Sequence, residues 1–97
     1  MQDTITLEKV QKYFDVTRRA LEKVQSLNTQ KIDTDPIVHD VFDMASRYVA
    51  DAEHFFEKND YVNAFAALNY AHGWLDCGAR LKIFDVQGDS ILFTVDE

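Results

Sequence analysis

The sequence predicts an all-α fold, an up-down-up antiparallel three-helix bundle followed by an extended C-terminal tail. Three glycines and one proline among 97 residues leave few turn positions, which favours a few long helices over a many-stranded sheet. Apolar side chains recur at helical spacing over about residues 6–27, 36–58 and 61–83. Because 46% of the residues are apolar, residues 1–97 are expected to form a single helical domain.

The first predicted helix covers about residues 6–27. Its apolar positions lie three or four residues apart, as on one face of an amphipathic helix: Leu7, Val10, Phe14, Thr17, Leu21 and Val24. Thr4 or Thr6 provides a hydroxyl that can cap its first turn. The polar segment that follows, residues 28–34, is expected to be a loop.

Strong start and stop signals bound the second helix, predicted over residues 36–58. Asp35 followed by Pro36 places a capping carboxylate before a proline at the first helical position. At the other end, Asn59 suits the left-handed conformation that ends a helix, and Asp60 can cap the next one. The turn is therefore very short, and the second and third helices should form an antiparallel hairpin.

The third helix is predicted over residues 61–83, with a broad apolar face: Tyr61, Ala64, Ala67, Leu68, Ala71, Trp74, Leu75, Gly78 and Ala79. In the remaining tail, residues 85–97, Gly88 and Asp89 mark a turn. The stretch "ILFTV" is rich in strand-forming residues but is too short to build a sheet alone. We expect it to lie extended over the bundle.

Charge and cysteine content exclude several classes of function. The net charge is −7, and an acidic surface repels phosphate backbones, so no nucleic-acid partner is expected. No apolar run approaches the roughly 20 residues of a membrane span, and the first residues lack the features of a signal peptide. With Cys77 as the single cysteine, neither an intrachain disulfide nor a cysteine-based zinc site is possible. A cytoplasmic protein without a membrane partner is expected.

Two glycines interrupt the third helix within "NYAHGWLDCGARL", residues 69–81. Gly78 falls on the apolar face, where a small residue lets a neighbouring helix approach closely. Gly73 falls on the opposite side, with Asn69, Asp76 and Arg80. Because alanine or lysine would suit an exposed helix better than glycine, Gly73 indicates either that something lies against the backbone or that the glycine is merely tolerated there. The chain's own tail, a second subunit and an external partner are the three alternatives for such a contact.

No catalytic arrangement is evident from the residues. Cys77 and His72 point roughly 140° apart on one helix, so they do not form a nucleophile–base pair. A metal site would need ligands from both helices of the hairpin, such as Asp51, His54 and His72, and we expect none. Phosphate-binding loops and hydrolase motifs are also missing. We therefore expect no enzyme activity, no cofactor and no metal.

The run "FFEKNDYVNAFAALNYAHGWLDCGARLKIFDV", with the later "LFTV", resembles an archaeal family of small helical domains called domain of unknown function 357. The resemblance extends over most of the chain, and it is strongest in the second and third helices. The motif is matched at Asp60, Tyr61, Ala64, Tyr70, Ala71, Gly73, Trp74, Leu75, Asp76, Gly78 and Arg80. It implies a fold similar to the immunoglobulin- and albumin-binding three-helix bundles, and no established activity. Cys77 stands where family members often carry alanine, so the resemblance implies no thiol chemistry.

The expected function is that of a non-enzymatic protein-interaction or self-association module, with an unknown protein or a second copy as its partner. The expected interface lies on the third helix, at Asn69, Tyr70, His72, Gly73, Trp74, Asp76 and Arg80. The alternative is a small-ligand or metal-binding domain that uses Asp76, Arg80 and His72 as polar anchors. In a third, purely structural interpretation, the "ILFTV" tail covers Gly73.

Overall fold

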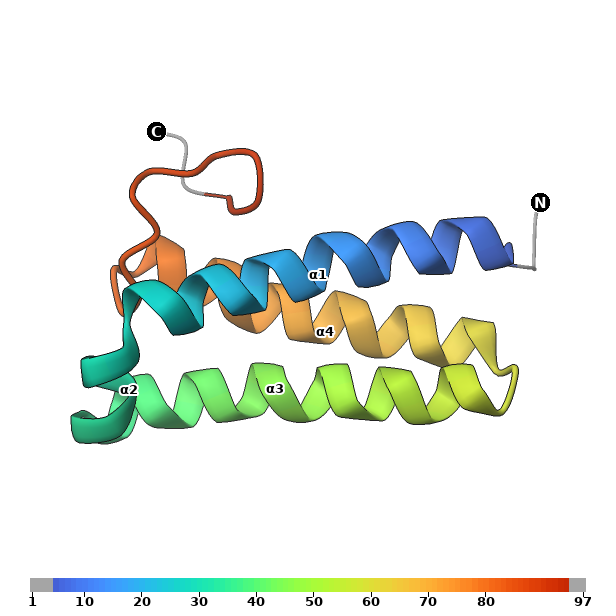
Figure 1. The fold of residues 1–97 in the computed structure, drawn as a ribbon, viewed down its shortest axis with the longest axis horizontal. Helices are drawn as coiled ribbons and strands as arrows, with labels where there is room; N and C mark the ends of the chain where they lie inside the picture. The colour runs from blue at the N-terminus through green and yellow to red at the C-terminus, as the bar shows by residue number, and fades with distance from the viewer. Residues whose placement is uncertain (1–4, 95–97) are drawn as a thin grey trace.

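The computed structural model describes residues 5–94 and shows an all-helical fold (Figure 1). It contains four helices, α1 (Leu7–Leu27), α2 (Thr29–Thr34), α3 (Pro36–Glu57) and α4 (Tyr61–Arg80). The three long helices run alongside one another, and α4 lies between α1 and α3 in Figure 1. No strand occurs between residues 5 and 94. The prediction of an all-α fold is therefore confirmed, whereas the prediction of three helices is not.

The predicted helix starts are confirmed by side-chain caps. Thr6 accepts a hydrogen bond from the amide of Lys9 (3.1 Å). Asp35 accepts from the amide of Ile37 (2.9 Å), and Pro36 occupies the first turn. Asp60 accepts from the amide of Asn63 (3.2 Å). Each cap satisfies an amide that has no partner within its own helix.

Helix α2 corrects the prediction of a loop over residues 28–34. It is six residues long, with Ile32 as its buried residue. A single apolar side chain cannot establish a helical period, so the pattern looked like that of a polar loop. The hydroxyls of Thr29 and Thr34 donate to carbonyls four residues earlier, each at 2.8 Å.

Helices α3 and α4 end in the same way, although only one of the two ends was predicted. At the end of α3, Asn59 has a φ of 61°, and the amide of Asp60 donates to the carbonyl of Phe55 (2.9 Å). At the end of α4, Lys82 has a φ of 62°, and the amide of Ile83 donates to the carbonyl of Gly78 (2.8 Å). Both are Schellman motifs. Lysine is an unusual residue for this position, so the end of α4 was predicted three residues too late, at Ile83.

Two hydrophobic clusters form the core. One lies at the α3–α4 hairpin end and joins all three long helices: Val10, Phe14, Ala52, Ala64, Ala67 and Leu68. The other lies at the opposite end and includes four residues from beyond the last helix: Phe84, Val86, Leu92 and Phe93. The segment that follows α4 is therefore part of the core at one end of the bundle.

This C-terminal segment, residues 81–94, is not extended, which corrects the prediction for the described part of the tail; residues 95–97 lie outside the described residues. It folds back through successive turns (Figure 1). Gln87 and Gly88 both have positive φ, at 56° and 68°, and the amide of Asp89 donates to the carbonyl of Val86 (3.1 Å). The turn predicted at Gly88 is therefore present. It reverses the chain, so that Phe84 and Phe93 are both buried.

Asn28 ties this segment to the junction of α1 and α2. Its side chain is 2% exposed, and its Nδ2 donates to the carbonyl of Asp85 while its Oδ1 accepts from the amide of Asp85 (2.9 and 2.8 Å). A buried polar side chain needs such partners. This pair of hydrogen bonds fixes the start of the C-terminal segment against the bundle.

Candidate functional site

An open groove runs along an exposed side of α4. It has a volume of about 590 Å³ and is lined by Ala66, Asn69, Tyr70, Gly73, Trp74 and Cys77. These residues recur at intervals of three and four, so they form one stripe of a helix. None of them is charged.

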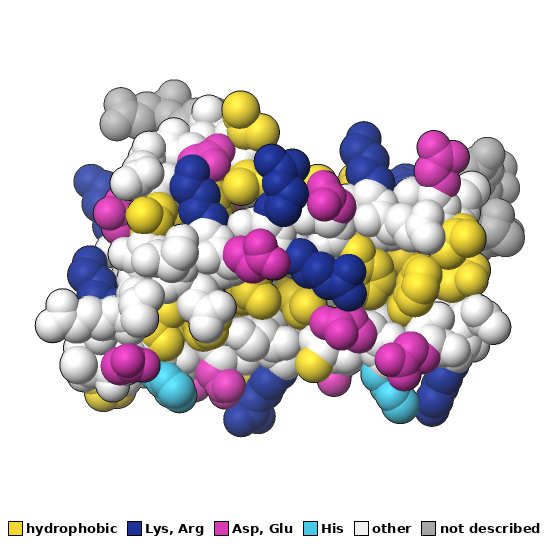
Figure 2. Space-filling model, in the orientation of Figure 1, with side chains coloured by type: hydrophobic (Ala, Val, Ile, Leu, Met, Phe, Trp, Pro, Cys, Tyr) yellow, Lys and Arg dark blue, Asp and Glu magenta, His cyan; other side chains and the backbone are white. Residues whose placement is uncertain are grey.

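Helix α4 carries apolar residues on more than one side, and the groove lies on the apolar side that is exposed. Its inner side is buried: Ala64, Ala67, Leu68, Ala71, Leu75, Gly78 and Ala79. Between Tyr61 and Ala79, Asp76 is the only residue of the Asp, Glu, Lys and Arg types. A helix that is apolar on most sides is normally buried, yet the outer side of α4 is exposed. On the face of the molecule that Figure 2 shows, charged side chains of both signs are scattered.

Tyr70 is the most prominent side chain of the groove. It is 63% exposed, and its ring stacks on Tyr48 of α3, with centroids 5.3 Å apart and ring planes 19° apart. This stacking holds one face of the Tyr70 ring against α3. Tyr70 was predicted to lie in the interface, whereas Tyr48 was not, because their contact depends on the register of the hairpin.

Gly73 lies in the groove and is exposed. A Cβ atom built on it would have nothing within 4 Å. The interpretation in which the chain's own tail covers Gly73 is therefore wrong for the described residues. The space above its backbone is open.

The space beside Gly78, five residues later, is filled by the chain itself. A Cβ atom on Gly78 would overlap Cδ2 and Cε2 of Phe84. The prediction that Gly78 serves packing is confirmed, but its neighbour is the ring of Phe84 from the C-terminal segment and not another helix.

His72 and Asp76 turn away from the groove and bind the C-terminal segment. His72 Nε2 donates to the carbonyl of Leu92 (2.8 Å), and because a carbonyl only accepts, Nδ1 can accept from the hydroxyl of Thr17 in the neutral ring (3.3 Å). Asp76 Oδ1 accepts from the amide of Thr94 (2.9 Å). The predicted site therefore divides in two, because these two residues do not share the open face with Gly73.

Of the remaining predicted residues, two line the groove and one lies at the end of α4. Asn69 lines it and is exposed, and Arg80 is exposed at the end of α4. Trp74 lines it too, but it is partly buried and packs against the core cluster at the tail end. Cys77, which was not among the residues of the predicted interface, is exposed and lines the groove. Its spacing of four from Gly73 is the signal that could have placed it there.

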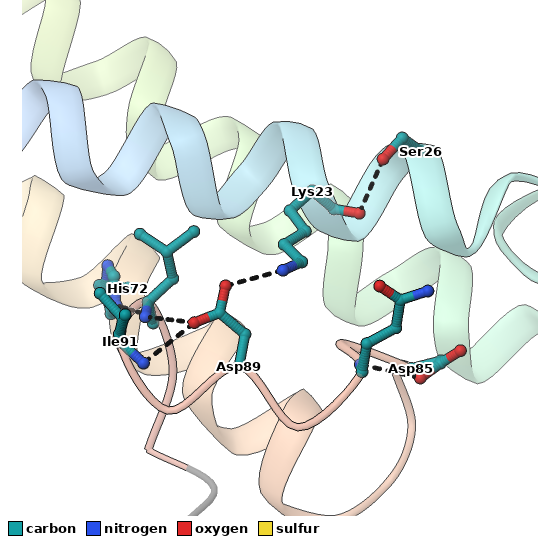
Figure 3. Close-up of polar contacts among 8 residues, drawn as sticks. Lys23, Ser26, His72, Asp85, Asp89 and Ile91 are labelled. Carbon is teal, nitrogen blue, oxygen red and sulfur yellow. Dashed lines mark hydrogen bonds and ion pairs between the residues drawn. The ribbon is translucent and has the colours of Figure 1, made fainter.

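A second polar contact secures the C-terminal segment on the side of α1, as Figure 3 shows. Lys23 Nζ donates to Asp89 Oδ2 (2.8 Å), while Asp89 Oδ1 accepts from the amides of Ile91 and Leu92 (2.9 and 3.0 Å). The hydrogen bond from Lys23, followed by those from the two amides, lowers the pKa of Asp89 below its ordinary 3.8. The segment is thus held by polar contacts to both α1 and α4.

No group of three or more His, Cys, Asp or Glu side chains that could hold a metal ion occurs in residues 5–94. In particular, His72 is directed at Thr17 and Leu92, which removes it from the Asp51–His54 arrangement weighed above. Among the helices of the described chain, none is long and apolar enough to cross a membrane.

Comparison with known proteins gives a family. A family model described as "Protein of unknown function (DUF357)" matches residues 12–84, which include α2, α3, α4 and most of α1. No curated protein and no solved structure matches the chain.

Proposed function

Because the chain belongs to the DUF357 family, whose function is unknown, we propose from its structure that it is a protein-interaction module whose binding surface is the outer groove of α4. The observation that supports this most directly is the uncovered glycine. Gly73 weakens α4 by about 1 kcal/mol relative to alanine and has no neighbour that requires it. A partner that lies against the helix backbone would require it.

The chemistry of the groove favours a protein partner. Its lining is uncharged and largely apolar, and it contains a tyrosine and a tryptophan, the residues most enriched among those that dominate binding energy. The adjoining Tyr48 keeps Tyr70 in place, so little side-chain entropy is lost on binding.

The alternative of a small-ligand or metal-binding domain has less support. Of its three anchors, Asp76 binds the amide of Thr94 and His72 binds the carbonyl of Leu92. Both polar groups are therefore occupied by the chain itself, and they face the C-terminal segment rather than the groove.

Cys77 provides the test, because an exposed thiol in the groove reports on whether the groove is covered. We expect maleimide to alkylate Cys77 several-fold more slowly in a native extract of the source cells than in dilute purified protein. Gly73→Leu, which fills the groove, should abolish this protection and leave the circular dichroism of the helices unchanged.

The matched control moves the thiol to an exposed position of α1. In Cys77→Ser/Ser26→Cys, alkylation should proceed at the same rate in extract and in buffer. If wild-type Cys77 instead reacts at equal rates in both, and as fast as the exposed thiol of the control, the groove is not covered by any macromolecule, and the proposed function is wrong.

A further inference from the structure

We propose that the partner of the α4 groove is a second copy of this chain, bound antiparallel about a two-fold axis at the middle of α4, between Ala71 and His72. This inference rests on the function proposed above and specifies the partner. In such a dimer, each subunit presents the same surface, and every contact occurs twice.

The groove residues are placed symmetrically about the middle of α4. Tyr70 and Gly73 are equidistant from the point between Ala71 and His72, and so are Ala66 and Cys77. When two such helices lie antiparallel with these midpoints together, Tyr70 faces Gly73 of the second copy, and Ala66 faces Cys77 of the second copy.

In this pairing, a large side chain of each copy faces an open space on the other copy. Tyr70 projects from the helix with 63% of its surface exposed, and the space above Gly73 is open. The ring of each subunit would fill the space above the glycine of the other. A parallel pair would instead place the two Tyr70 rings together and leave the two glycines facing each other across a void, which is unfavourable for packing.

Small and apolar residues extend the complementary surface along α4. Ala66 and Cys77 are small enough for two helix backbones to approach closely. Four residues beyond each of them lie Val62 and Leu81, which are 54% and 64% exposed. The row therefore spans α4, which at about 1.5 Å per residue is roughly 30 Å long.

The adjoining surface of α3 broadens this row. A stable interface buries about 800 Å² on each partner, which is more than one helix row provides. Tyr48 lies beside Tyr70, and Ile37, three helical turns before Tyr48 on the same side of α3, is 65% exposed. Tyr48 adds apolar area next to the groove, and Ile37 adds apolar area further along the same side of α3.

Charge also selects this surface for self-association. Two copies with a net charge of −7 each repel one another, and the uncharged groove is where they can approach at the least electrostatic cost. Added salt screens this repulsion. We therefore expect the association constant of the dimer, measured by sedimentation equilibrium, to rise with salt concentration.

Disulfide trapping tests the antiparallel arrangement. In purified Ala66→Cys protein, the new thiol would face Cys77 of the second copy, so mild oxidation with diamide should give a disulfide-linked dimer on a non-reducing gel. The same two thiols within one chain are eleven residues apart on the helix, about 16 Å, which is too far for a disulfide.

Two single-cysteine proteins are the matched controls. In wild type and in Ala66→Cys/Cys77→Ser, like residues of an antiparallel pair lie about 16 Å apart along the helix, and neither protein should form a linked dimer. Equal linking of both controls and of Ala66→Cys would overturn the antiparallel arrangement.

Complementary variants test the contact between Tyr70 and Gly73. Gly73→Tyr places two rings against each other, and Tyr70→Ala leaves two voids, so each alone should weaken dimerisation about thirtyfold or more, the scale of a dominant interface residue. An equimolar mixture should recover a dimer, because each tyrosine of one variant then faces a small residue of the other. Failure of the mixture to associate contradicts the pairing.

The outcomes separate this inference from the proposed function. If purified wild type sediments as a monomer at all concentrations while Cys77 is protected in the extract, the partner is another protein, and only the self-association is wrong. If Cys77 is unprotected in the extract as well, both are wrong.

Discussion

The two glycines of α4 lie five residues apart and have opposite surroundings. Gly78 is covered by Phe84, and a Cβ atom there would overlap its ring, whereas Gly73 has nothing within 4 Å. The same contrast holds for the two flanks of the helix, since His72 and Asp76 bind the C-terminal segment while Tyr70 and Cys77 remain exposed. A glycine that costs helix stability can thus serve the chain's own packing or leave room for another molecule.

The largest expected effect on the covered flank comes from Phe84→Ala. Phe84 is 2% exposed and belongs to the core cluster at the tail end, so its truncation should lower the free energy of unfolding by about 3–5 kcal/mol. Urea unfolding followed by circular dichroism measures this. A loss below about 1 kcal/mol would show that the C-terminal segment contributes little to the core.

Asn28→Ala should be the next most damaging change. It would leave the amide and carbonyl of Asp85 without the partners they have in the structure, at a cost of about 2–3 kcal/mol in the free energy of unfolding. Asn69→Ala, the matched change in the open groove, should stay within about 0.5 kcal/mol of wild type. Equal losses of stability in Asn28→Ala and Asn69→Ala would show that the C-terminal segment is held no more firmly than the open groove.

Alanine at the two glycines should change stability in opposite directions. Gly78→Ala should be destabilising by about 1–2 kcal/mol, because displacement of Phe84 outweighs the gain in helix propensity. Gly73→Ala should raise the free energy of unfolding by up to about 1 kcal/mol in the monomer, because its new methyl group meets no atom. Thermal unfolding of both variants at low protein concentration shows whether each substitution stabilises or destabilises the fold. In Phe84→Ala protein, Gly78→Ala should no longer be destabilising.

The smallest effect is a pH dependence of the covered flank. Because the folded-state pKa of Asp89 is lowered below 3.8 by Lys23 and two amides, its contribution to stability is present above that ordinary value and is lost as the pH falls through the folded-state pKa. Asp89→Asn and Lys23→Met should each reduce the fall in Tm between pH 7 and about pH 3. An unchanged fall in both variants would show that the contact does not stabilise the fold.

The fold was predictable wherever local chemistry determines the backbone. Asp35, Pro36, Asn59 and Asp60 are residues whose side chains or preferred φ angles mark helix ends, and each does so in the structure. The end of α4 was missed because Lys82 adopts a positive φ that lysine rarely takes. Tertiary packing of Phe84 against Gly78 supports that conformation, and no local pattern reveals it.

The candidate site was predicted in part for a similar reason. The helical period correctly placed Asn69 and Gly73 on one side of α4. It also grouped Asp76 with them, because a helical wheel does not show where the C-terminal segment turns back to bind that carboxylate. Tyr48 was missed, since its contact with Tyr70 joins two helices and depends on their exact separation.

The position of the C-terminal segment in the core has a consequence for the order in which the two ends of the bundle fold. Its contacts join residues far apart in the sequence, with sequence separations of 57 for Asn28 and Asp85 and 66 for Lys23 and Asp89. Contacts of such long range form late, because closing a long loop costs entropy before any contact repays it. The cluster at the hairpin end contains no residue beyond Leu68 among its buried members, so its assembly does not depend on the contacts of the C-terminal segment. The opposite end of the bundle is completed only when Phe84 and Phe93 have packed into it.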